Sequence, residues 1–190
     1  AVELLSEMRR RGVLPTRITY NRAIGVCGNS RQLDVAVELV DDMRRHGIDP
    51  DVVTYNTMIT GCGKVEQADR ALQLLQQMRE CGINPDVVSY NAAITACRSE
   101  GAWQRALELL EEMRRHGIEP NIISYNAAIT SCRLSGRWEP ASKLLYEMRA
   151  HGIEPNKISY NSAIAACTRH GKWERARDLL VELRDRMAAL

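Results

Sequence analysis

Apolar residues follow the chain in short stripes with the spacing of one helix face, and two such stripes occupy every 35 residues. Within 87–121, the first stripe falls at i, i+4 and i+7, and the second follows Gly101. The stripes contain Tyr90, Ile94 and Cys97, and then Trp103, Ala106, Leu110 and Met113. Such spacing is typical of amphipathic helices. The pattern therefore predicts a hairpin of two helices, joined by a turn at the glycine, whose stripes form a core.

The helix pair is repeated in register along the chain. A Tyr-Asn pair, a proline and a glycine each recur with a step of 35 residues, at Tyr20, Tyr55, Tyr90, Tyr125 and Tyr160, at Pro15, Pro50, Pro85, Pro120 and Pro155, and at Gly12, Gly47, Gly82, Gly117 and Gly152. The frame is a partial repeat, 1–16, four full repeats, 17–51, 52–86, 87–121 and 122–156, and a fifth, 157–190, that is one residue shorter. Because a lone hairpin cannot bury its stripes and stacked neighbours can, we expect a single all-α solenoid over 1–190.

Short polar residues mark the predicted start of each first helix. Serine and threonine are favoured N-caps, and one of them stands before every Tyr-Asn pair: Thr19, Thr54, Ser89, Ser124 and Ser159. The preceding residue is aliphatic, which suits a hydrophobic staple; these residues are Ile18, Val53, Val88, Ile123 and Ile158. At the other end of the repeat, Gly117 is expected as the C′ residue, and Pro120 prevents continuation. Pro140 falls in a first turn, where proline is tolerated.

One face of the first helix, beside the apolar stripe, carries small and polar residues that suit the lining of a groove. The fifth residue of every repeat is asparagine: Asn21, Asn56, Asn91, Asn126 and Asn161. An asparagine side chain has both donors and an acceptor, so it can read a base edge, but near a helix start it can equally satisfy backbone groups. The last residue of each full repeat is Asp51, Asp86, Asn121 or Asn156. Turn formation after proline is the simplest interpretation of these four residues.

Charge is distributed unevenly between the two helices of a repeat. The net charge is only +2, but the first fourteen positions of the five repeats contain seven basic residues and one acidic residue, Glu100. The rest of the chain is therefore mildly acidic. A basic face beside the polar stripe is what a phosphate backbone requires. Lys64, Arg98 and Arg133 are the candidates for weaker phosphate contacts.

The cysteines and histidines predict neither a metal site nor a catalytic site. Five of the six cysteines recur at the 35-residue step on the core stripe: Cys27, Cys62, Cys97, Cys132 and Cys167. Equivalent positions of stacked helices lie about 8–10 Å apart, which exceeds disulfide and zinc geometry. Cys81 stands outside the stripe and is expected to be more exposed. We expect no cofactor and no catalysis, and no apolar run approaches the roughly 20 residues that span a bilayer.

The repeat resembles that of the pentatricopeptide repeat family. Its diagnostic pieces are V-x-[TS]-Y-N at the start, A-L-x-L-L-x-x-M in the second helix and G-I-x-P-[DN] at the end, and 52–86 contains all three. The departures are Arg17 and Lys157 at the first position, and Ser142 and Arg177 after the alanine of the second helix. The resemblance implies a right-handed α-α superhelix that binds single-stranded RNA in mitochondria or chloroplasts, in RNA processing, stability or translation.

In that family the fifth and last residues of a repeat together select one base. The resemblance implies uracil for Asn21 with Asp51 and for Asn56 with Asp86. It implies cytosine, then uracil, for Asn91 with Asn121 and for Asn126 with Asn156. The implied target is 5′-UU(C/U)(C/U)-3′, and Asn161 lacks a last-position partner in this chain. The aliphatic second residues, Ile18, Val53, Val88, Ile123 and Ile158, are implied to stack against the bases.

A non-catalytic protein-interaction subunit of a larger assembly is the main alternative. Helical solenoids present long surfaces that also bind proteins, and four to five repeats read few bases. Apolar residues at the two ends of the array, including Leu4 and Leu5, are expected to need further repeats or protein partners to cover them. RNA binding and protein binding therefore both remain open on the sequence.

Overall fold

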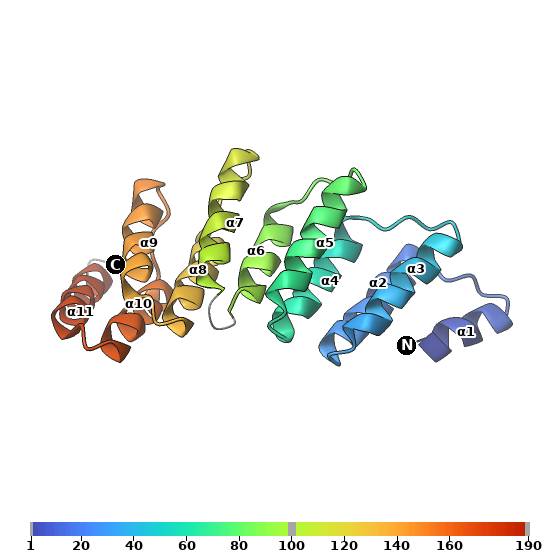
Figure 1. Ribbon diagram of the computed structural model, residues 1–190, viewed down its shortest axis with the longest axis horizontal. Coiled ribbons are helices and arrows are strands. Elements are labelled where there is room, and N and C mark those ends of the chain that lie inside the picture. Colours follow the sequence, from blue (N-terminus) through green and yellow to red (C-terminus); the bar gives the residue numbers. More distant parts are fainter. Residues whose placement is uncertain (1, 99–101, 189–190) are drawn as a thin grey trace. The chain divides into compact units, whose positions relative to one another are not determined.

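The computed structural model describes residues 2–98 and 102–188 and is built from paired helices (Figure 1). The helices are α1 (Val2–Arg10), α2 (Arg17–Asn29), α3 (Leu33–Arg45), α4 (Val52–Lys64), α5 (Ala68–Glu80), α6 (Val87–Ala96), α7 (Trp103–Arg115), α8 (Ile122–Leu134), α9 (Trp138–Ala150), α10 (Lys157–Arg169) and α11 (Trp173–Ala188). The described residues contain no strand, and the all-α fold of two-helix repeats is confirmed. None of the helices in these two ranges is long and apolar enough to span a membrane.

The chain forms two compact units, 1–96 and 97–190. In the first unit, α2 packs against α3 and α4, and α4 packs against α5 and α6. In the second unit, α8 packs against α7, α9 and α10, and α10 packs against α9 and α11. The first helices α2, α4 and α8 therefore each contact their own second helix and the first helix of the next repeat. Gly101 and Glu100 lie outside the described residues.

The first helices begin three residues earlier than the sequence indicates. The N-caps are Thr16, Asp51, Asn121 and Asn156, in extended backbone, and the prediction of N-caps at the serine and threonine residues is wrong. Thr54 instead occupies the third helical position, where its N–H donates to Asp51 Oδ1 and its hydroxyl accepts from the Asp51 N–H, at 2.9 and 3.2 Å. This reciprocal capping box satisfies two N–H groups at once, which a cap at Thr54 alone would not do.

The correction moves the aliphatic second residues into the first turn of each helix. A hydrophobic staple needs an apolar residue before the cap, so that prediction is also wrong. Ile18, Val53, Val88, Ile123 and Ile158 are instead 56 to 69% exposed. At the helix C-termini, Gly117 adopts a φ of 71° and donates to the Arg114 carbonyl at 2.9 Å, as predicted for a C′ glycine. Pro140 lies in the first turn of α9.

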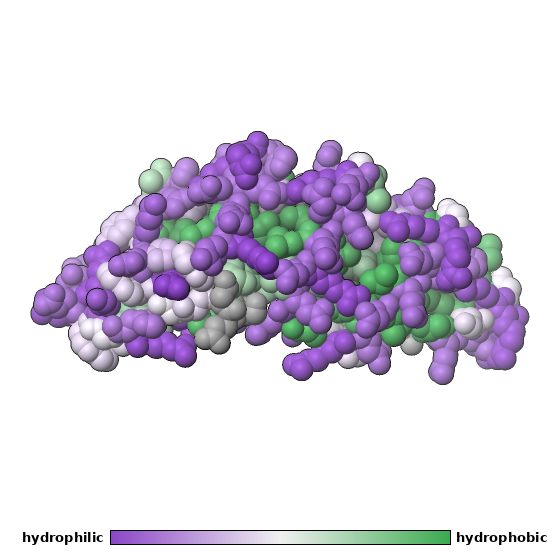
Figure 2. All heavy atoms as spheres, in the orientation of Figure 1, coloured by the Kyte–Doolittle hydropathy of each residue, from purple (hydrophilic) through white to green (hydrophobic). Residues whose placement is uncertain are grey.

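The core consists of the predicted stripes, with one exception. The repeat tyrosines and cysteines are buried, as are Ile94 and Leu110, whereas Cys81 is exposed. The second-helix methionines of the four full repeats are buried as well: Met43, Met78, Met113 and Met148. Tryptophan was predicted in the core, but Trp173 is 66% exposed and Trp103 is only partly buried. The ring of Trp103 instead lies under the Arg137 guanidinium of the next repeat, whose Cζ is 5.4 Å from the ring centroid. Polar side chains cover most of the surface seen in Figure 2, and apolar atoms show between them.

Buried tyrosine hydroxyls form a recurring cluster that the sequence analysis missed. Each tyrosine hydroxyl accepts from an arginine of the preceding repeat, as in Arg44 to Tyr55 at 2.9 Å and Arg79 to Tyr90 at 2.8 Å. An acidic residue of the second helix completes the cluster in other repeats, where Arg114 contacts both Tyr125 and Glu147. Burying a hydroxyl without a partner is costly, so these arginines stabilise the buried tyrosines of the following repeat.

The cluster around Tyr55 lacks its carboxylate, because Gln77 stands where Glu147 stands two repeats later. Gln77 lines the same hollow as Arg44 and Tyr55. Gln77→Glu is therefore expected to raise the free energy of unfolding, by at most about 1 kcal/mol, since Arg44 is partly solvent-exposed. Chemical denaturation at low salt measures the gain, which should shrink in 1 M salt. A loss of stability would show that the cluster does not accept a carboxylate here.

Candidate nucleic-acid interface

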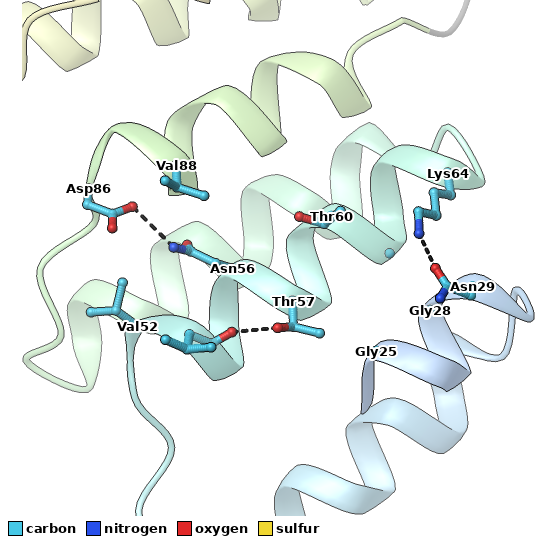
Figure 3. A pocket seen from close by; sticks show the side chains of 12 residues that line it. Gly25, Gly28, Asn29, Val52, Asn56, Thr57, Thr60, Lys64, Asp86 and Val88 are labelled. Atoms are coloured by element: carbon cyan, nitrogen blue, oxygen red, sulfur yellow. Dashed lines mark hydrogen bonds between the residues drawn. The ribbon is translucent and has the colours of Figure 1, made fainter. Parts of the chain in front are cut away.

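A groove with a volume of about 500 Å³ runs along the first helices of the first unit (Figure 3). It is lined by Gly25, Gly28 and Asn29 of α2, by Val52, Val53, Asn56, Thr57, Thr60, Gly61 and Lys64 of α4, by Asp86 just before α6, and by Val88 of α6. The helices α2 and α4 approach closely because Gly28 faces Gly61; a Cβ atom on Gly28 would lie 3.1 Å from the Gly61 Cα. The groove is therefore floored by small residues and edged by polar and aliphatic ones.

The fifth and last residues of a repeat lie beside each other on this face. Asn56 Nδ2 donates to Asp86 Oδ1 at 3.1 Å, as Figure 3 shows. The corresponding distances are 3.5 Å for Asn21 to Asp51 and 3.4 Å for Asn126 to Asn156, both near the limit of a hydrogen bond. The structure thus brings together three of the four pairs that the sequence indicates.

The members of the fourth predicted pair lie in different compact units. Asn91 belongs to the first unit and Asn121 to the second. Asn121 caps α8, and Asn161 is exposed on α10.

The aspartates of the pairs are held in the charged form. Partial burial raises the pKa of Asp51, but hydrogen bonds from the Thr54 N–H and hydroxyl and from Asn21 outweigh it, and the pKa falls below its usual 3.8. The pKa of Asp86 is lowered in the same way, against partial burial, by Ser89, Asn56 and the Val88 N–H. A depressed carboxyl pKa keeps the group ionised at neutral pH. Both side chains are therefore acceptors only.

The asparagine N-caps differ from the aspartate N-caps in the hydrogen-bonding group that faces away from the helix. Asn156 Oδ1 accepts from the N–H groups of Ile158 and Ser159, at 3.0 and 3.1 Å. Since its oxygen faces the helix N-terminus, its amide NH₂ faces away from it, and NH₂ is a donor only. Repeats that end in Asp therefore offer an acceptor beside the fifth-position asparagine, whereas repeats that end in Asn offer a donor.

The exposed aliphatic residues and the cations border the same surface. Val53 and Val88 line the same groove as Asn56 and are 57 and 56% exposed, so apolar side chains lie in solvent on the surface that holds the polar pair. Lys64 also lines the groove and donates to Asn29 Oδ1. Arg98, in the turn after α6, is exposed, and Arg133 on α8 is partly buried.

Three further residues contact the predicted site residues and were missed by the sequence analysis. Thr54 and Ser89 contact the fifth-position asparagines directly, with Thr54 Oγ1 2.7 Å from Asn21 Oδ1. Arg17 lies 3.7 Å from Asp51 and donates to the Asp49 carbonyl at 3.1 Å. Arg17 was visible as a departure from the repeat pattern, whereas the two hydroxyl residues gave no signal beyond a helix cap.

Solved structures with the same fold include RNA-binding proteins. Maize pentatricopeptide repeat protein PPR10 is 26% identical over 95% of this chain, with a TM-score of 0.81. The same protein in complex with an 18-nt psaJ RNA element matches 94% of the chain at 24% identity and a TM-score of 0.76. The chain spans about a quarter of either PPR10 chain, 26%.

A second solved structure is similar to this chain in fold alone. The PPR domain of Arabidopsis thaliana protein-only RNase P 1, in complex with tRNA, is 18% identical, with a TM-score of 0.71 over 87% of this chain and 88% of that one. A comparison with curated proteins finds no significant match.

Family models cover nearly the whole sequence. A pentatricopeptide repeat domain model matches residues 1–30 and 38–100, and a PPR repeat family model matches 85–133 and 120–169. A single PPR repeat model matches 18–48 and 158–186. The chain belongs to the pentatricopeptide repeat family.

Proposed function

We propose that this chain binds single-stranded RNA, with about one base per repeat, and catalyses no reaction. The observation that carries the proposal is the groove lined both by the hydrogen-bonded pair Asn56 and Asp86 and by the exposed side chains of Val53 and Val88. Single-stranded RNA offers base edges to polar groups and base faces to apolar ones. The two kinds of side chain on this surface meet those two needs.

The base preference follows from the last residue of each repeat. Uracil has a donor at N3, which the acceptor-only carboxylates of Asp51 and Asp86 match. Cytosine has an acceptor at N3, which the outward NH₂ of Asn156 matches. The proposed target is therefore uracil at the first two full repeats and cytosine, or less favourably uracil, at the next two, 5′-UU(C/U)(C/U)-3′.

Two further groups of residues contribute without selecting a base. The aliphatic second residues of successive repeats, such as Val53 and Val88, would hold a base between them. Lys64, and more weakly Arg98 and Arg133, would contact phosphates. With a net charge of only +2, the affinity should be modest and should fall as salt rises.

A titration of fluorescent RNA tests this function. We expect a 10-mer that contains UUCC to bind more tightly than poly-A at low and at physiological salt, and we expect Asn56→Ala/Asp86→Ala to lose that preference. Because Asp86→Ala also removes a helix N-terminal partner, worth about 0.5–2 kcal/mol, circular dichroism must show that the variant is folded. Equal, salt-sensitive binding of all RNAs would reject base reading.

A protein-interaction subunit remains the second candidate. Leu180 and Val181 on α11 are 51 and 42% exposed, and Leu4 on α1 is 64% exposed; such residues suit a protein contact or a further repeat. If no RNA binds above background, co-purification of protein partners becomes the informative measurement. We also propose, on family membership alone, that this work is RNA processing, stability or translation in mitochondria or chloroplasts. Fractionation of tagged protein would test the localisation.

A further inference from the structure

We infer that the base-reading site of each repeat includes a third side chain, the hydroxyl of the third residue of the following repeat. This inference rests on the proposed function and deepens it. The hydroxyl acts as a positioning group: it orients the fifth-position asparagine, which in turn contacts the base. Base selection would then depend on three residues from two repeats.

The same contact is present wherever the two residues lie in one unit. Ser89 Oγ donates to Asn56 Oδ1 at 2.6 Å, Thr54 Oγ1 to Asn21 Oδ1 at 2.7 Å, and Ser159 Oγ to Asn126 Oδ1 at 2.6 Å. Thr54, Ser89 and Ser159 are fully buried, at 0% exposure. These contacts are shorter than those between the asparagine and the last residue, which range from 3.1 to 3.5 Å.

The hydroxyl decides which way the amide faces. An asparagine amide can turn over and exchange its oxygen for its NH₂. Within the capping box, Ser89 Oγ accepts from the Asp86 N–H at 3.1 Å, and its single proton has two acceptors in reach, Asn56 Oδ1 at 2.6 Å and Asp86 Oδ1 at 2.9 Å, of which Asn56 is the nearer. Donation to Asn56 Oδ1 leaves the NH₂ facing Asp86, which is the arrangement seen. Without the hydroxyl, only the longer contact to the last residue holds the amide.

The hydroxyl at the third position of a repeat has two roles, the capping box and the contact to the asparagine. The first repeat has the first role without the second. Thr19 forms the same capping box with Thr16, with bonds of 3.2 and 3.4 Å. Its side-chain bonds in the described part of the chain are with Thr16, and no asparagine faces it. Thr19→Val therefore removes a cap contact alone, whereas Thr54→Val removes the same contact and the bond to Asn21.

The test measures dissociation constants for RNAs that differ only at the base opposite repeat 1. Thr54→Val is expected to reduce the preference for uracil over cytosine there by about 3- to 10-fold, the worth of one hydrogen bond, and to leave the preference opposite repeat 2 unchanged. Thr54→Ser should restore the preference. Thr19→Val should leave both preferences unchanged, with a smaller loss of thermal stability than Thr54→Val, since the Thr54 hydroxyl is fully buried and makes one hydrogen bond more.

If the unmodified chain selects uracil and Thr54→Val keeps the same uracil-to-cytosine ratio as Thr19→Val, the inference is overturned and the proposed function stands. If the unmodified chain selects no base, the proposed function fails and the inference fails with it. Should Thr54→Val not fold, Ser159→Ala provides the same comparison opposite repeat 4, in the second unit. An unchanged preference there would overturn the inference as well.

Discussion

Replacing Asp86 by asparagine is expected to move the preference of repeat 2 from uracil to cytosine by about 10-fold or more, since a well-matched base contact is worth about 1–3 kcal/mol. The Asp86 carboxylate is an acceptor that suits the uracil N3–H, whereas the asparagine in the same capping position of α10 turns its NH₂ outward. The helix should remain capped, because Asn is as good an N-cap as Asp. Dissociation constants for UUCC and UCCC RNAs measure the change.

Two matched variants separate base reading from charge. Asn156→Asp makes the opposite change and should move repeat 4 from cytosine to uracil. Asp34→Asn removes the same charge from α3, where Asp34 pairs with Arg70 at 2.8 Å, and should leave base preference alone. If Asp86→Asn strengthened binding of all RNAs equally, the carboxylate would be repelling phosphates rather than selecting a base.

Leu145→Ala is expected to lower the free energy of unfolding by about 2–5 kcal/mol, the usual cost of emptying a fully buried leucine site. Leu145 on α9 is completely buried, at 0% exposure. Thermal and urea unfolding followed by circular dichroism measure the loss. The size of the effect reflects how much the stability of each repeat depends on its neighbours.

Leu180 is the matched control because it occupies the same repeat position one repeat later. It is 51% exposed on α11, so Leu180→Ala should cost less than about 1 kcal/mol, as surface substitutions generally do. Equal losses for the two variants would contradict the view that stacking, rather than the helix itself, stabilises this position.

The sequence was most informative where a residue acts within its own helix. Periodicity alone placed the helices, the buried tyrosines and cysteines, and the glycine at each C-terminus, because these depend on residues three to four apart. It failed for Trp103, which opens a second helix with the right spacing for the core but is only partly buried, under the Arg137 guanidinium of the next repeat. Helix periodicity does not indicate which residues of a helix the neighbouring repeat covers.

For the candidate site as well, the sequence indicated some features and missed others. The recurrence of asparagine at the fifth position, and of aspartate or asparagine at the last, was evident from the sequence. The serine and threonine residues were read as N-caps, yet they occupy the third helical position and also contact an asparagine 33 residues earlier. Nothing local indicates such a contact, since it arises only when one repeat packs on the next.

The amino-acid sequence by itself determined that this protein is a helical repeat array, which residues face the core, and which polar residues recur on one face. These follow from a fixed period of 35 residues and from the 3.6-residue turn of the helix. Only the tertiary structure decided which arginine satisfies each buried tyrosine and how the asparagine amides are oriented. Those features depend on contacts between residues of adjacent repeats, which stacking sets and no single repeat encodes.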